Sequence, residues 1–208
     1  MPRVAIVDYG AGNLDSVARA LDVTGGSPVL AREPAGLAGA THVVLPGVGS
    51  FGSGIAVLRA RGFEVPLREM AVCQRIPVLG ICLGMQLLAS LGTEPVDVSG
   101  LGLVDGTVRR LVPTTPTEKV PHVGWNEVHH DGKSPLFRGI DSGRSFYFVH
   151  SYRFEARHST VVAATTPHCG GFVSAVQQGN IFGVQFHPEK SQRAGLALLA
   201  NFLTFAGG

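Results

Sequence analysis

The stretch IPVLGICLGMQLLAS, residues 76–90, predicts a strand, a sharp turn and a helix in immediate succession. Its apolar first part suits a strand that is buried on both faces of a parallel sheet. Gly80 and Gly84 flank Cys82 in the pattern G-x-C-x-G, which is the thiol version of the G-x-S-x-G nucleophile elbow. Glycines at these positions remove side chains that would collide in the turn, and the turn presents Cys82 at the carboxyl edge of the sheet. A small buried core thiol is the alternative interpretation.

The elbow belongs to a series of strand–helix units in the first half of the chain. Such a series predicts a parallel sheet that is covered by helices on both faces. The expected strands are residues 3–10, 27–31 and 41–52, and the expected helices are residues 13–25, 53–62 and 64–75.

The second half has shorter strand signals, separated by Gly, Pro, Asp and Asn. Strands are expected at residues 147–154, 161–166 and 172–188, with a hairpin turn at Gly179–Asn180. The apolar segment 192–206 predicts a final helix. We therefore expect one α/β domain over residues 1–208, with a largely parallel mixed central sheet flanked by helices.

The composition is that of a lightly charged globular chain. Hydrophobic residues make up 45% of the 208 residues and charged residues 15%, against about 25% in an average domain. The net charge of +2 and the lack of any Lys/Arg run longer than two argue against nucleic-acid binding. Three cysteines without a C-x-x-C pair, no leader-like start and no membrane-length apolar run favour a reducing compartment. We expect a cytoplasmic protein that uses no cofactor and no metal.

A cysteine nucleophile needs a base, and the segment GVQFHPEKS, residues 183–191, supplies the best candidate. Pro188 biases His187 toward an extended backbone, in which residues two apart point to the same side. Glu189 is then placed to hold one imidazole nitrogen while the other faces a thiol. A histidine in a surface turn is the alternative. However, of the eight histidines only His187 combines a carboxylate partner, extended geometry and a preceding apolar strand.

The glycine-rich segment LPGVGSFG, residues 45–52, follows another apolar strand. Backbone N–H groups at a strand end can face an anion, so those near Gly47 and Val48, with that of Leu83, are candidates for an oxyanion hole. A phosphate-binding loop is the rival interpretation, but no G-K-[ST] follows the glycines.

These three motifs, in this order, resemble the class I glutamine amidotransferases, and the likeness spans nearly the whole chain. LPGVG matches the oxyanion loop, GICLGMQ the nucleophile elbow and FHPE the base with its orienter. The resemblance implies that Cys82 attacks the side-chain amide of glutamine, that ammonia leaves, and that water releases glutamate from the thioester. It makes His187 the general acid/base and Glu189 its orienter.

Residues 8–14, 46–51, 121–128 and 147–152 narrow the likeness to the glutaminase subunits of imidazole glycerol phosphate synthases. This closer resemblance implies a heterodimer with a barrel-shaped cyclase subunit. The cyclase uses the ammonia to make imidazole glycerol phosphate and an aminoimidazole carboxamide ribotide in histidine biosynthesis. The resemblance also implies low glutaminase activity until the partner binds its own substrate, and we expect the oxyanion loop to aim correctly only then. Trp125 is either a packed side chain or an interface anchor.

The same resemblance assigns a substrate pocket. Gln86 and Glu94 are expected to hold the α-amino and carboxylate groups of glutamine, and Gln86 lies one helical turn after Cys82, so that it can face the same way. The remaining pocket residues, partly through their backbone, are Gly49, His150, Ser151 and Tyr152. Two alternatives stay open: the glutaminase of anthranilate or pyridoxal phosphate synthesis, and a non-catalytic domain whose elbow cysteine senses oxidants.

Overall fold

The computed structural model describes residues 1–206. Its strands are β1 (Arg3–Val7), β2 (Ser27–Ala31), β3 (His42–Gly47), β4 (Val78–Cys82), β5 (Leu91–Gly92), β6 (Val98–Ser99), β7 (Gly106–Arg110), β8 (His122–Val128), β9 (Arg144–His150), β10 (Tyr152–Ala156), β11 (Val162–Thr166), β12 (Phe172–Gln178) and β13 (Ile181–Val184). Its α-helices are α1 (Leu14–Val23), α2 (Phe51–Ala60), α3 (Glu64–Arg68), α4 (Leu83–Leu87) and α5 (Gln192–Thr204).

One large sheet organises the molecule, in the order β2-β1-β3-β4-β13-β12-β10-β7-β5-β6, with β11 beside β12. Pairing is parallel from β2 to β13 and then antiparallel from β13 to β7. The predicted α/β fold with a mixed, largely parallel sheet is confirmed. The predicted hairpin is present as well, because Gln178 pairs with Ile181 across Gly179–Asn180.

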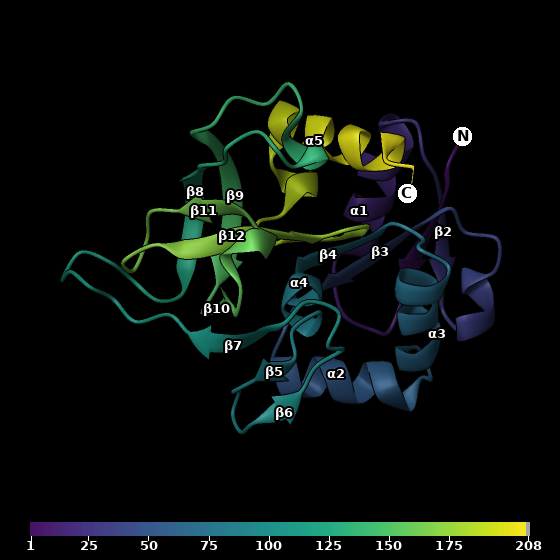
Figure 1. The fold of residues 1–208 in the computed structure, drawn as a ribbon, viewed down its shortest axis with the longest axis horizontal. Coiled ribbons are helices and arrows are strands. Elements are labelled where there is room, and N and C mark those ends of the chain that lie inside the picture. Colours follow the sequence, from purple (N-terminus) through teal and green to yellow (C-terminus); the bar gives the residue numbers. More distant parts are fainter. Residues whose placement is uncertain (207–208) are drawn as a thin grey trace.

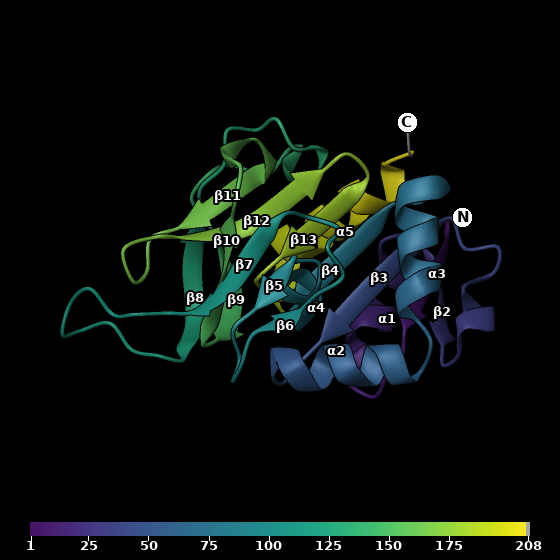
Figure 2. The same cartoon turned by 60° about the horizontal axis from the view of Figure 1, so that its bottom comes forward.

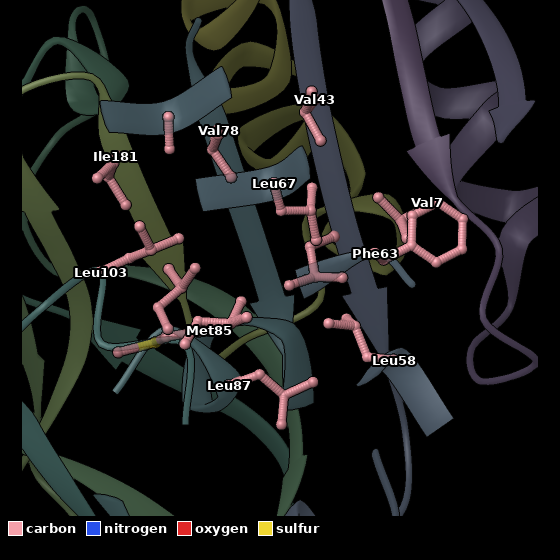
Figure 3. Packing of buried hydrophobic residues seen from close by; sticks show 14 of the residues in the cluster. Val7, Val43, Leu58, Phe63, Leu67, Val78, Met85, Leu87, Leu103 and Ile181 are labelled. Atoms are coloured by element: carbon pink, nitrogen blue, oxygen red, sulfur yellow. The ribbon is translucent and has the colours of Figure 1, made fainter. Parts of the chain in front are cut away.

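Helices cover both faces of the parallel half of the sheet. Helices α1 and α5 lie on one face, and α2, α3 and α4 lie on the other (Figure 1). The second view shows the strands running between these layers (Figure 2). On the α2–α3 face, Leu58 and Leu67 pack over Val43 and Val78 of the central strands, all at most 1% exposed (Figure 3). Burial on both faces explains why these strands have continuous apolar sequences.

The segment 147–154, expected as one strand, is two strands in different sheets. β9 pairs with β8 in a separate antiparallel ribbon, whereas β10 joins the central sheet. The chain changes sheets at Ser151. Both strands are rich in aromatic and branched residues, so hydrophobicity alone does not reveal the break.

The expected helix 64–75 is also divided. Helix α3 passes into a π-helical turn, Glu69–Cys73. Cys73 is exposed, and Cys169 is buried in a turn with a φ of 52°. Within residues 1–206, every helix is too short or too polar to cross a membrane.

Candidate active site

Cys82 lies at the junction of β4 and α4 with a φ of 54° and a ψ of −110°, a conformation that few non-glycine residues adopt. The flanking glycines are required by close packing and not by their own φ. A Cβ on Gly80 would come within 2.7 Å of the backbone of Gly84 and Met85, and one on Gly84 would overlap the Leu45 carbonyl oxygen. The start of α4 therefore lies directly against β3 and β4, which holds the thiol at the carboxyl end of the sheet.

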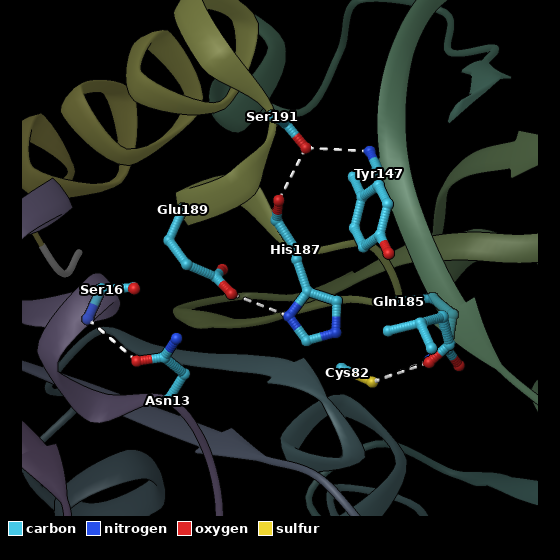
Figure 4. A network of polar contacts seen from close by, with 9 residues as sticks. Asn13, Ser16, Cys82, Tyr147, Gln185, His187, Glu189 and Ser191 are labelled. Carbon is cyan, nitrogen blue, oxygen red and sulfur yellow. Dashed lines mark hydrogen bonds and ion pairs between the residues drawn. The ribbon is translucent and has the colours of Figure 1, made fainter. Parts of the chain in front are cut away.

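His187 and Glu189 form a buried pair after β13. Nδ1 of His187 lies 2.8 Å from Oε1 of Glu189, and the two side chains are 5% and 2% exposed (Figure 4). The structure thus brings the two side chains together, but not through the continuous extended backbone expected from the sequence. Only His187 is extended; Pro188 starts a 3₁₀ turn, Pro188–Lys190, that carries Glu189 back to the ring. The fixed φ of proline suits the first position of such a turn.

The main chain of His187 is held by two neighbours. Its N–H donates to the Tyr147 carbonyl at 2.9 Å, and its carbonyl accepts from the Ser191 hydroxyl at 2.6 Å. Ser191 Oγ also accepts from the N–H of Tyr147 at 3.0 Å. The imidazole Nε2 is left pointing toward Cys82 (Figure 4). Fixing the backbone in this way positions the ring without occupying Nε2.

The proton state of His187 follows from its two neighbours. Burial lowers the pKa of the imidazole, because it disfavours the charged form. Hydrogen bonding and charge from Cys82 and Glu189 outweigh burial and raise the pKa to about 9. The ring therefore keeps its proton at neutral pH, and an imidazolium beside a cysteine stabilises the thiolate.

The loop after β3 runs beside the elbow. Gly47 pairs with Cys82 in the parallel register between β3 and β4. The Tyr9 hydroxyl packs so closely on Gly47 that a Cβ there would overlap it, and the Leu83 side chain is the next neighbour. Val48 is 50% exposed. The three residues expected to form an oxyanion hole, Gly47, Val48 and Leu83, thus lie around the elbow.

A cavity of about 400 Å³ opens beside Cys82. The expected substrate-binding residues all line it: Gly49, Gln86, Glu94, His150, Ser151 and Tyr152. Glu94 is fixed in place, because the N–H of Phe51 donates to its Oε2 at 3.0 Å. Cavities of roughly 300–1,000 Å³ are typical of small-molecule sites, so the space suits an amino acid.

The sequence analysis missed Gln185, which connects the elbow to this cavity. Its Nε2 donates to the Cys82 sulfur at 3.7 Å, and its Oε1 accepts from Nε2 of Gln86 at 3.0 Å. Nε2 of Gln86 also donates to the Tyr152 carbonyl at 3.2 Å. Both N–H bonds of the Gln86 amide are thereby used. A signal for Gln185 was present, because it is a lone polar residue two positions before His187 in an otherwise apolar segment.

Two buried histidines of the β8–β9 ribbon form a directed hydrogen-bond chain at the cavity. Nδ1 of His150 lies 2.8 Å from the Tyr152 carbonyl oxygen, which can only accept, so Nδ1 carries the proton and Nε2 accepts. Nδ1 of His122 therefore donates to that Nε2 at 3.0 Å, and Asn126 donates to Nε2 of His122 at 3.1 Å.

Both histidines of this chain are neutral at pH 7. Burial, assisted by neighbouring histidines, lowers the pKa of His150 to about 3 and that of His122 to about 4. One tautomer of each ring thus fixes the Tyr152 carbonyl, which in turn holds Gln86. The sequence gave no sign of this chain, because it depends on the register that places His122 opposite His150. The cavity lining also includes three residues that the sequence analysis did not single out: Arg110, Pro121 and Val149.

One group of potential metal ligands occurs among the described residues outside this site. Glu118, His168 and Cys169 offer ligand atoms within 4.8 Å of one another. The Glu118 carboxylate already accepts from the N–H groups of Thr114 and Cys169, both at 2.6 Å. These bonds join two loop segments, so the anion is satisfied by the chain itself.

A strained cysteine, a buried His–Glu pair and an adjoining cavity make the site that of a cysteine-dependent amide hydrolase. The chain belongs to the class-I glutamine amidotransferase family, whose profile, "Glutamine amidotransferase class-I", matches residues 5–205. Within that family, its curated relatives are HisH subunits of imidazole glycerol phosphate synthase. The protein of Moorella thermoacetica is 48% identical over 97% of this chain and 94% of its own length. That of Symbiobacterium thermophilum is 46% identical over 97% of this chain and 93% of its own length.

Solved structures share the fold at lower sequence identity. A chain described as a glutamine amidotransferase superimposes with a TM-score of 0.77 at 20% identity, and 99% of each chain is covered. A chain of the PurLQS structure from Thermotoga maritima gives a TM-score of 0.74 at 20% identity, with 97% of each chain covered. Both support the fold class that the strand order already indicates.

Proposed function

We propose that this chain is a glutaminase subunit, which hydrolyses L-glutamine to L-glutamate and ammonia through a thioester on Cys82. The observation that supports this most directly is the position of Cys82, between the His187–Glu189 pair and an amino-acid-sized cavity. We take the whole chain, residues 1–208, as one glutamine amidotransferase domain, and the cytoplasm as its compartment.

In the first half-reaction, the Cys82 thiolate attacks the amide carbon of glutamine while His187 holds the proton. A carbon–sulfur bond forms, and the carbonyl electron pair moves onto oxygen. N–H groups of Leu83 and of the Gly47–Val48 segment are proposed to stabilise this oxyanion. His187 then gives its proton to the amide nitrogen, the carbon–nitrogen bond breaks and ammonia leaves.

Water completes the reaction. His187 takes a proton from water as its oxygen attacks the thioester, the carbon–sulfur bond breaks, and glutamate leaves with the thiolate restored. In both halves Glu189 holds the proton on Nδ1, so that Nε2 carries out the exchange. We propose that Gln86 and Glu94 hold the α-groups of glutamine and that Gly49, His150, Ser151 and Tyr152 complete the pocket.

We further propose that a cyclase subunit docks on the outer face of the β8–β9 ribbon. Val123 and Val149 lie opposite each other there, as do Trp125 and Tyr147. Val123, Trp125 and Val149 are 57%, 49% and 37% exposed, and Val149 also lines the cavity. Exposed apolar clusters with a tryptophan are typical of interfaces. The curated relatives are named as subunits of a synthase, which agrees with a heterodimer.

In this heterodimer the ammonia passes to the cyclase, which makes imidazole glycerol phosphate and aminoimidazole carboxamide ribotide in histidine biosynthesis. The test is glutamate release from glutamine by the isolated chain, by the complex, and by the complex with the cyclase ligand bound. We expect release to be highest in the last case. A complete complex that releases no glutamate would contradict the proposal, and an isolated chain as active as the complex would contradict its dependence on the partner.

A further inference from the structure

The cavity beside Cys82 has one acidic and one basic side chain in its lining, Glu94 and Arg110. Glutamine likewise carries one α-ammonium and one α-carboxylate group besides its reacting amide. We propose that Arg110 binds the α-carboxylate of glutamine and thereby makes the site specific for a free amino acid. This inference rests on the proposed glutaminase function and names the group that recognises the acid end of its substrate.

The other polar side chains of the cavity are suited to accept hydrogen bonds and not to donate them to a carboxylate. Both N–H bonds of Gln86 are used by Tyr152 and Gln185, so only its Oε1 is left. Glu94 is an anion that repels a carboxylate. The N–H of His150 is directed to the Tyr152 carbonyl, and its Nε2 accepts from His122. Gln86 and Glu94 together suit the α-ammonium, and the carboxylate needs a different partner.

The strand register directs Arg110 toward the cavity. Side chains two apart on a strand share a face, and Arg110 is two residues after the fully buried Val108. Across the β7–β10 pairing Arg110 lies opposite Tyr152, and both residues line the cavity. Arg109 points to the other face of the strand, where its Nε lies 3.2 Å from Oε2 of Glu155.

The guanidinium of Arg110 is available for a ligand. In the described part of the chain it makes no hydrogen bond or ion pair, whereas Arg109 and Arg153 both pair with Glu155. A guanidinium matches a carboxylate with two parallel hydrogen bonds, a geometry that a lysine ammonium does not reproduce. An unpaired arginine at the end of a buried strand is therefore well placed to orient the substrate with its amide toward Cys82.

The test compares Arg110→Gln with the matched control Arg109→Gln in the complete complex. We expect the KM for glutamine to rise roughly 10- to 100-fold in Arg110→Gln, with kcat changed by less than about threefold, because a charge-assisted contact to a non-reacting group is lost. Arg110→Lys should recover part of the loss. Arg109→Gln, on the opposite face of the same strand, should leave both constants near those of the unchanged protein.

A substrate lacking the carboxylate separates recognition from a general effect on the site. The probe is 4-aminobutanamide, which is glutamine without its α-carboxylate, used as a substrate at high concentration. The unchanged complex should strongly prefer glutamine, and Arg110→Gln should lose that preference while its kcat/KM for the probe stays the same. Equal losses on both amides would overturn the inference, as would an unchanged KM for glutamine, which would assign the carboxylate to backbone N–H groups. Failure of the proposed function is distinct, because the unchanged complex would then release no glutamate at all.

Discussion

Two buried histidine sites adjoin the Cys82 elbow, and burial affects both, yet their proton states are opposite. His187 lies against Glu189 and Cys82, and its pKa rises to about 9. His122 and His150 lie against each other and a backbone carbonyl, and their pKa values fall to about 4 and 3. The comparison shows that the charge of the partner, and not the depth of burial, decides which ring keeps a proton.

The two sites therefore serve different purposes. A charged ring with a free Nε2 can move a proton, whereas two neutral rings in a directed chain can only orient their neighbours. The sites also affect stability with opposite dependence on pH. A histidine whose folded pKa is raised stabilises the fold below pH 6.5, and this contribution is lost as pH rises toward 9. A histidine whose folded pKa is lowered weakens the fold as pH drops below 6.5.

The largest expected effect is on His187 itself. His187→Ala removes the group that exchanges protons with Cys82 and the amide nitrogen, so kcat for glutamine hydrolysis by the complex should fall at least about 10³-fold. The matched control is His129→Ala, because His129 is an exposed histidine paired with Glu127 at 3.2 Å. A His187→Ala complex that keeps a tenth of its activity or more would exclude His187 as the general acid/base.

Glu189→Gln tests whether the carboxylate creates the difference between the two sites. The amide keeps the shape and loses the charge, so the pKa of His187 should fall from about 9 toward its ordinary value. We expect kcat to fall roughly 10²-fold, because the ring loses its fixed orientation and much of its proton affinity. NMR titration of imidazole-labelled protein follows the pKa. If it stays near 9, Cys82 alone sets the proton state and the comparison needs a different explanation.

The neutral pair predicts acid sensitivity. Between pH 6.5 and 4 the unfolded chain binds protons that His122 and His150 resist in the folded protein, so the free energy of unfolding should fall as pH drops. The slope for each such proton is at most about 1.4 kcal/mol per pH unit. Urea denaturation at a series of pH values measures it. His150→Gln should flatten the curve below pH 6.5 and leave the loss of stability between pH 6.5 and 9 intact. A slope in acid that is the same in both proteins would contradict this assignment.

The sequence was sufficient for one of these sites and not for the other. His187 and Glu189 are two residues apart, and the elbow lies within residues 80–84, so each is a local pattern with a local cause. The fold class followed in the same way, from continuous apolar strands alternating with helices. Even so, the pairing of His187 with Glu189 depends on a 3₁₀ turn and not on the extended backbone that led us to expect it.

The His122–His150 chain depends on contacts between residues that are distant in sequence. Its two rings meet because β8 and β9 pair in one particular register, and the chain reaches Tyr152 because the backbone changes sheets at Ser151. Arg110 reaches the cavity through a similar long-range register between β7 and β10. No period or short motif in the sequence encodes which residue lies opposite which.

The smallest expected effect comes from Tyr9, which provides burial without a partner. Its side chain is 1% exposed, its hydroxyl makes no hydrogen bond among the described residues, and burial together with the nearby charge of Cys82 raises its pKa. An unpaired buried hydroxyl carries its desolvation cost without compensation, so Tyr9→Phe should raise the free energy of unfolding by about 1 kcal/mol. Urea denaturation at pH 7 measures the change. A loss of stability instead would show that the hydroxyl has a partner in solution, and burial at the elbow would then never occur without one.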